Sequence, residues 1–166
     1  MEALIDVIAS TPTCSQIITV SWQVIEILSK HRQMKWWAKE CGGQLFGSVR
    51  DTEVDVSIAS GPYRNDYRSR FGYRSNPLSA QAAIDQHASR GLQYLGEWHT
   101  HPEQYPKASL EDKTTIACLL QKSALRLPIV IMMIQGTEPG IHGLALYTYG
   151  DAELIKWEIR QTPTGK

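Results

Sequence analysis

Two histidines, His99 and His101, lie two positions apart at the end of a segment whose sequence favours a strand. Residues i and i+2 of a strand project from the same face, about 6.5 Å apart along the chain. Two imidazoles at that separation can bind one zinc ion, and a catalytic zinc site uses three protein ligands and keeps one position open. Asp112, in the first turn of a predicted helix, is the candidate third ligand.

Each part of this pattern has a second interpretation. A His-x-His pair also occurs on plain protein surfaces, and Ser109 with Asp112 matches the Ser-x-x-acid capping box of many helix starts. The complete spaced set is much rarer than the histidine pair alone, which favours a metal site. The two interpretations are compatible, because Ser109 can cap the helix and still present its hydroxyl to the site.

A zinc hydrolase also needs a general base, because the pKa of a zinc-bound water is about 7 and a carboxylate must accept its proton. Glu40 is the candidate, since it precedes Gly42-Gly43, where the backbone can approach a neighbour closely. From the local sequence alone, a solvated surface acid is the commoner interpretation of Glu40. Three other glutamates lie nearer the histidines: Glu97, Glu103 and Glu111. Glu97 could instead orient a ligand imidazole.

The elements that must position these residues follow from periodicity and capping signals. We expect helices over residues 21–32, with Ser21 as the N-cap, over 77–90, between Asn76 and Gly91, and over 109–122. Strands are predicted at 17–20 (an edge strand), 44–49 and 54–58 (a hairpin with one buried face), 92–100, 128–134, 141–149 and 154–159. Helices packed against one sheet are typical of an α+β or α/β fold.

Residues 61–76 are predicted to form a polar loop in which arginines alternate with aromatic residues. This loop could be solvated, or it could line a groove beside the zinc. Guanidinium groups suit carbonyls and carboxylates, and an extended tail could add to a sheet edge in such a groove. The candidate substrate-binding residues are Arg64, Arg68 and Arg70.

Composition limits the class of protein. The chain has 166 residues, 17 Lys plus Arg and 17 Asp plus Glu, and 42% of its residues are hydrophobic. We expect a single domain, with a core over about residues 17–159 and a loose tail at 162–166. The zero net charge argues against a nucleic-acid partner bound by broad phosphate neutralisation. Without an apolar run of about 18 residues or a basic N-terminal segment, we expect a cytoplasmic protein with no membrane partner. The three cysteines are expected to be reduced and mostly buried.

The ordered set of motifs resembles a known family. Glu40 followed by Gly42-Gly43-Gln44-Leu45-Phe46-Gly47, then His99-x-His101-Pro102, then Ser109-x-x-Asp112, is similar to the signature of the JAMM (MPN/JAB) zinc metalloproteases. The resemblance covers the chain from about Ile17 to Tyr149. It is specific because all the motif positions agree across roughly 70 residues.

The resemblance implies a role for each matching residue. His99, His101 and Asp112 would bind one zinc ion per chain, Glu40 would act as general acid/base on a water at the metal, and Ser109 would stabilise the oxyanion. The implied fold is cytidine-deaminase-like, with a curved mixed sheet flanked by helices.

The resemblance also implies a substrate class. Members of the family cleave the bond after the C-terminal glycine of ubiquitin or ubiquitin-like proteins, so the expected partner is a protein with an extended C-terminal tail. More narrowly, the chain is similar to small stand-alone prokaryotic JAB proteins, some of them encoded in CBASS antiphage operons. It is too short for the insertions that select one ubiquitin-chain linkage. The alternatives are a JAB hydrolase that trims a sulfur-carrier-like protein or small peptide conjugate, and a non-catalytic MPN scaffold.

Overall fold

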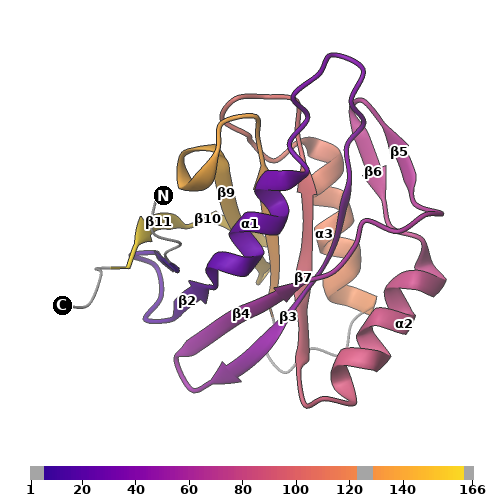
Figure 1. Cartoon of the computed structure of the whole chain (residues 1–166). Helices are drawn as coiled ribbons and strands as arrows, with labels where there is room; N and C mark the ends of the chain where they lie inside the picture. Colours follow the sequence, from indigo (N-terminus) through magenta and orange to yellow (C-terminus); the bar gives the residue numbers. More distant parts are fainter. Residues whose placement is uncertain (1–5, 123–128, 163–166) are drawn as a thin grey trace.

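The computed structural model describes residues 6–122 and 129–162, in which a nine-stranded mixed sheet is flanked by helices (Figure 1). In chain order the elements are β1 (Val7–Ser10), β2 (Ile17–Val20), α1 (Trp22–Lys30), β3 (Gly42–Arg50), β4 (Glu53–Ala59), β5 (Tyr67–Ser69), β6 (Gly72–Arg74), α2 (Pro77–Ala88), β7 (Gln93–Thr100), α3 (Leu110–Lys122), β8 (Val130–Gln135), the 3-10 helix η1 (Gly140–Gly143), β9 (Leu144–Gly150), β10 (Glu153–Lys156) and β11 (Glu158–Gln161).

The sheet is strongly curled. Its strand order is β10-β9-β8-β7-β3-β4-β2-β1-β11, with β2–β4 and β7–β8 parallel and the other neighbours antiparallel. The two edge strands, β10 and β11, are separated in sequence by Trp157 alone, so the two edges of the sheet meet at this residue. Trp157 is buried, and its N–H donates to the carbonyl of Leu146. The expected α+β class with a curved mixed sheet is confirmed.

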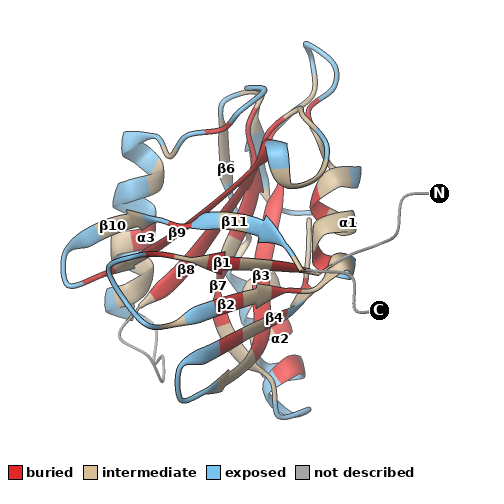
Figure 2. Ribbon diagram, turned by 90° about the vertical axis from the view of Figure 1, so that its left-hand side faces the viewer, coloured by how far each residue is buried: buried red, intermediate tan, exposed pale blue. Residues whose placement is uncertain are grey.

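The helices cover opposite faces of the sheet. Val24 and Leu28 of α1 belong to the main core, together with Trp98 of β7. On the other face, Ile116 of α3 packs with residues of β8 and β9, while His87 of α2 stacks on Phe46 of β3. In Figure 2 the buried residues run along the strands between these layers. The cavity described below lies on this second face of the sheet, beside α3.

Local signals explain the helix starts. The side chain of Asn76 accepts a hydrogen bond from the Ser79 N–H, and Pro77 is the first residue of α2, as predicted. Ser21 has the extended backbone of an N-cap, but its hydroxyl donates to the Ser57 carbonyl instead of capping α1. A carboxylate oxygen of Asp6 accepts from the Trp22 N–H. The start of α1 is therefore satisfied by a residue from outside the helix.

Several sequence-based expectations about strands are corrected. Residues 17–20 form an interior strand, because β2 pairs with both β1 and β4. The first six residues of β3 are all buried, so this strand is covered on both faces and not on one. The predicted loop 61–76 contains the hairpin β5–β6, and the predicted strand 154–159 is two strands broken at Trp157.

The ends of the core and the cysteines also differ from expectation. Val7 and Ala9 of β1 are buried, so the core begins before residue 17. Thr162 donates two hydrogen bonds to the Asp6 carbonyl, whereas residues 163–166 and residue 128 lie outside the described part of the chain. Cys14 and Cys118 are exposed and Cys41 is buried, so the expectation of mostly buried thiols was wrong. Among the helices in residues 6–122 and 129–162, none is long and apolar enough to cross a bilayer.

Replacing Gly43 with Ala is expected to destabilise the fold by about 3 kcal/mol or more. A Cβ atom at Gly43 would lie 1.7 Å from the backbone oxygen of Ser60, which cannot move aside as a flexible side chain would. The measurement is the free energy of unfolding in urea. Gly91→Ala is the control, because Gly91 has a positive φ of 79° but no atom within 4 Å of the added Cβ, and should cost only about 1–2 kcal/mol. Equal losses for the two variants would contradict this packing argument.

Candidate metal centre

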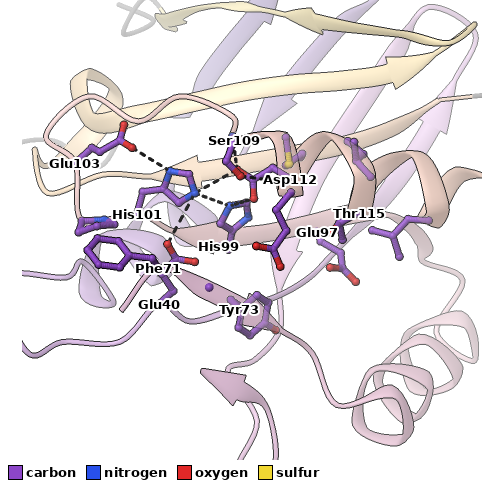
Figure 3. Close-up of a pocket in the computed structure, with 16 residues that line it drawn as sticks. Glu40, Phe71, Tyr73, Glu97, His99, His101, Glu103, Ser109, Asp112 and Thr115 are labelled. Carbon is purple, nitrogen blue, oxygen red and sulfur yellow. Dashed lines mark hydrogen bonds and ion pairs between the residues drawn. The ribbon is translucent and has the colours of Figure 1, made fainter. Parts of the chain in front are cut away.

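The end of β7 and the residues around it hold the two histidines in place. The Thr100 N–H donates to the Cys41 carbonyl, and the His101 N–H donates to the Gln135 carbonyl, both at 2.9 Å. These bonds tie the chain on either side to β3 and β8. His99 and His101 therefore project from the same side of β7, toward α3 (Figure 3).

Three candidate ligand side chains converge in the structure. The Nε2 atoms of His99 and His101 are 3.1 Å apart. The carboxylate of Asp112 lies against both, with Oδ1 3.0 Å from His99 Nε2 and Oδ2 3.3 Å from His101 Nε2. His99 and His101 are both buried. Two imidazoles and one carboxylate directed at a single point could hold a metal ion.

The capping box at the start of α3 orients the aspartate. The Ser109 N–H donates to Asp112 Oδ2 at 2.6 Å, and the Asp112 N–H donates to Ser109 Oγ at 3.0 Å. The reciprocal pair fixes the rotamer of Asp112 while its carboxylate still faces the histidines. Ser109 and Asp112 therefore cap α3 and form part of the site at the same time, as the sequence analysis allowed.

The charge of this cluster is set by its neighbours. Burial alone would raise the pKa of Asp112, but hydrogen bonds from His101, His99 and the Ser109 N–H hold that pKa well below its usual range. Burial alone would lower the pKa of His101, yet Asp112 and Glu40 raise it. Asp112 is thus a carboxylate at neutral pH, which is the form that binds cations.

Glu40 reaches the cluster through backbone pairing. It lies one residue before Cys41, whose N–H bonds to Thr100 Oγ1, and Gly42 pairs in register with His99. The Glu40 side chain is buried, with Oε1 4.0 Å from His101 Nε2. Burial is the main reason that the pKa of Glu40 rises to about 7. A carboxyl group with such a pKa can both accept and release a proton near neutral pH.

The three predicted substrate-binding arginines do not line the cavity. Arg68 Nε donates to the Glu40 carbonyl at 2.8 Å, and Glu40 N–H donates to the Ser69 carbonyl at 2.8 Å. Arg68 therefore holds the backbone of Glu40, a role that the sequence interpretation missed. Arg70 bonds to the carbonyl of Trp36, and Arg64 is exposed on the loop before β5.

The rival glutamates occupy different places. Glu103 Oε1 is 3.9 Å from His101 Nδ1, on the far side of that ring from Asp112, and its side chain is half exposed. Glu97 lies along the cavity beyond the histidines, where it accepts a hydrogen bond from Gln44 Nε2. Burial raises the pKa of Glu97 to about 7. Glu111 lines the cavity from the first turn of α3.

The three candidate ligands, Ser109, Glu40 and the other three glutamates border one cavity of about 270 Å³. The polar end contains Glu40, Ser109 and the His-His-Asp cluster. Apart from Pro102 and the three other glutamates, the remaining wall is mainly apolar and comes from the β5–β6 hairpin, α3 and β8: Phe71, Gly72, Tyr73, Thr115, Ile116, Leu119 and Met132. An extended peptide could place a carbonyl group at the cluster and the neighbouring chain along this wall.

Comparison with known protein families gives one match to the chain. Residues 23–147 match the family described as prokaryotic homologues of the JAB domain. A CD-NTase/cGAS isopeptidase of Pseudomonas aeruginosa is 30% identical over an alignment of 138 positions that covers 73% of this chain and 87% of that protein. A protein of Escherichia coli with the same name is 32% identical over 98 residues, and the match spans 63% of its length and 57% of this chain.

Two further comparisons concern activity and fold. A probable metalloprotease of Sinorhizobium fredii is 27% identical over 126 residues, covering 72% of this chain and 75% of that protein. The solution structure of a Desulfitobacterium hafniense protein superposes with a TM-score of 0.64 at 19% identity, over 84% of this chain and 88% of the other. This second likeness concerns the fold alone.

Proposed function

The chain belongs to the family of prokaryotic homologues of the JAB domain, and from this premise we propose that it is a metalloprotease of the JAMM class that acts as a zinc-dependent isopeptidase or peptidase. Its substrate would be a protein joined to the C-terminal tail of a ubiquitin-like protein. The observation that carries the proposal is the convergence of His99, His101 and Asp112 on one point, with the Glu40 carboxyl beside it.

Zinc is the proposed metal because the donor set and its spacing suit it. Bonds of about 2.0–2.1 Å in a tetrahedral site place neighbouring ligand atoms about 3.3–3.4 Å apart. The two Nε2 atoms are 3.1 Å apart, and the Asp112 carboxylate lies 3.0 Å from His99 Nε2 through Oδ1 and 3.3 Å from His101 Nε2 through Oδ2. Zinc would act as a Lewis acid that polarises the scissile carbonyl and makes water acidic.

The protein side chains would perform the proton transfers. Glu40 would accept a proton from the attacking water and pass it to the leaving amine, as its pKa near 7 permits. Ser109 Oγ accepts from the Asp112 N–H, which leaves its own O–H free to donate to the oxyanion of the carbonyl under attack.

The hairpin β5–β6 would guide the tail of the substrate. The Glu40 N–H donates to the carbonyl of Ser69, the last residue of β5. Phe71 in the turn, and Gly72 and Tyr73 in β6, border the cavity. An extended tail could add to β6 and so run toward the metal centre. Arg64 and Arg70, on the loop and hairpin, stay predicted contacts for parts of the substrate outside the cavity.

The relatives named as isopeptidases support a conjugate as substrate. We also propose a role in antiphage defence, which the resemblance to JAB proteins encoded in CBASS operons implies. The test is incubation of the zinc-loaded protein with a ubiquitin-like protein fused or conjugated through its tail, followed by mass spectrometry. We expect products cut after the last residue of the tail, and no products when a chelator is added. Cleavage only of a sulfur-carrier-like fusion would support the alternative hydrolase, and no bound zinc with no cleavage would support a scaffold.

Replacing Ser109 with Ala is expected to lower kcat by about 100-fold, because one donor to the oxyanion is lost. Zinc content should stay near one per chain, since all three ligands remain. The loss of the cap should also reduce the free energy of unfolding by about 1 kcal/mol. Asn76→Ala is the matched control, because it removes the N-cap of α2 at similar cost and should leave kcat unchanged. Equal kcat losses in both variants would mean that Ser109 acts only through stability.

A further inference from the structure

The cavity continues past the two histidines to a further glutamate, Glu97. Glu97 lies on β7 two residues before His99, in register with Gln44 of β3 and Met132 of β8. Figure 3 places its side chain beyond His99, near Tyr73 and Thr115, on the same side of the sheet. Glu97 is surrounded by protein on most sides, and it lines the cavity with the surface that stays accessible.

The carboxylate of Glu97 lacks a compensating positive charge. Within residues 6–122 and 129–162 it accepts one hydrogen bond, from Gln44 Nε2 at 3.3 Å, and takes part in no ion pair. Tyr63 O–H donates to Gln44 Oε1 at 2.7 Å, which fixes the amide so that its nitrogen faces Glu97. A buried carboxylate with a single long neutral hydrogen bond is unfavourable unless another donor reaches it.

The remaining walls indicate what that donor is. Among the residues that the structure describes, no lysine or arginine lines the cavity, whereas Glu103 and Glu111 add further carboxyl groups to it. Apart from Thr115 and the carboxyl groups, the cavity wall outside the metal centre is largely apolar, with Tyr73, Leu119 and Met132 among its residues. A largely apolar cavity that holds a carboxylate fits a side chain with an aliphatic stem and a cationic head, which is the chemistry of lysine and arginine.

We propose that Glu97 is a specificity-determining residue that binds a lysine or arginine side chain of the substrate segment lying in the cavity. The cationic head is placed against the free oxygen of Glu97 while the scissile bond lies at the His-His-Asp cluster. This inference rests on the proposed peptidase function, because the segment that carries the basic residue is the one being cut.

The test compares cleavage of tail fusions that carry Lys, Met or Glu at each position flanking the scissile bond. Met serves as the neutral control because it keeps an unbranched stem of similar length. The wild-type protein is expected to prefer Lys over Met at one position by roughly 10- to 100-fold in kcat/KM, the range of a buried charge-assisted hydrogen bond. In Glu97→Gln this preference should shrink to about threefold or less, with the Met substrate cut at a nearly unchanged rate.

If Glu97 has a purely structural role, Glu97→Gln should lower kcat/KM for all substrates equally, and that outcome would overturn the proposal. A Lys preference that persists in Glu97→Gln would overturn it as well. Glu26→Gln is the matched control. It removes the same charge from an exposed position on α1, where Glu26 pairs with Lys30, and should leave the Lys preference intact.

A binding measurement separates this proposal from the proposed function. Synthetic tail peptides with Lys or Met at each position flanking the expected scissile bond are titrated into zinc-loaded Glu40→Gln protein, and fluorescence anisotropy gives Kd. Tighter binding of the Lys peptide that is lost when Glu97→Gln is added to the protein supports the subsite. This holds even if the wild-type protein cleaves no fusion; the proposed function is then wrong, but the proposed subsite is not. Equal Kd values for the two peptides overturn the subsite, whether or not cleavage is observed.

Discussion

Replacing Glu40 with Gln is expected to lower kcat/KM for a tail fusion by about 100- to 10,000-fold, the usual contribution of a general acid–base residue. The amide of Gln keeps the size and the hydrogen-bonding capacity of the side chain but cannot take up a proton. The backbone of residue 40 stays bonded to Ser69 and Arg68, so the position of the side chain should be preserved. Steady-state cleavage rates and zinc content per chain are the two measurements.

The zinc content of Glu40→Gln should equal that of the wild-type protein, because Glu40 is outside the ligand set in the structure. That result would separate a catalytic role from a role in metal binding. Glu103→Gln and Glu111→Gln provide the comparison, since both carboxylates lie near the cluster. If Glu40→Gln were fully active and Glu111→Gln inactive, the proton transfer would have to be reassigned to Glu111.

Replacing His99 with Ala is expected to abolish both zinc binding and cleavage. Removing one of three ligands leaves an aspartate and one imidazole, which is too few for a stable catalytic zinc site. The wild-type protein should bind about one zinc per chain and gain about 4 kcal/mol of stability when free zinc is 1,000 times the Kd. This corresponds to a rise in Tm of about 10 °C, which the variant should lack.

Metal analysis after dialysis and thermal unfolding with and without zinc would measure this effect. His142→Ala is the control, because His142 is an exposed histidine in η1, away from the cluster. It should bind zinc and shift in Tm as the wild-type protein does. A His99→Ala protein with one tightly bound zinc and an undiminished Tm shift would show that the metal lies elsewhere.

The local parts of the candidate site follow from sequence alone. Residues two apart on a strand share a face, so His99 and His101 had to project together if the segment was extended. Ser109 and Asp112 are a capping box, and the reciprocal hydrogen bonds of that motif are made within four residues. Short-range geometry of this kind depends on backbone rules and not on the rest of the fold.

The hairpin β5–β6 shows the opposite case. Its strands have three residues each and are not buried, so they lack the alternation that identifies a strand. Its position depends on contacts with distant residues, such as the bond from Arg68 to the Glu40 carbonyl. The same holds for β2, whose interior place depends on pairing with β1, a strand that the sequence interpretation did not contain.

The sequence by itself determined the starts of α2 and α3, the strand that leads into the two histidines and the pairing of Ser109 with Asp112, because each depends on neighbours within one turn or one strand. Only the tertiary structure decided that Glu40 lies beside His101, that Arg68 holds Glu40 from behind, and that Glu97 lines the same cavity. These placements come from the pairing of β3 with β7 and from the packing of the hairpin near the site. Strand pairing between distant segments brings such residues together, and the sequence around either residue does not indicate which residue it will contact.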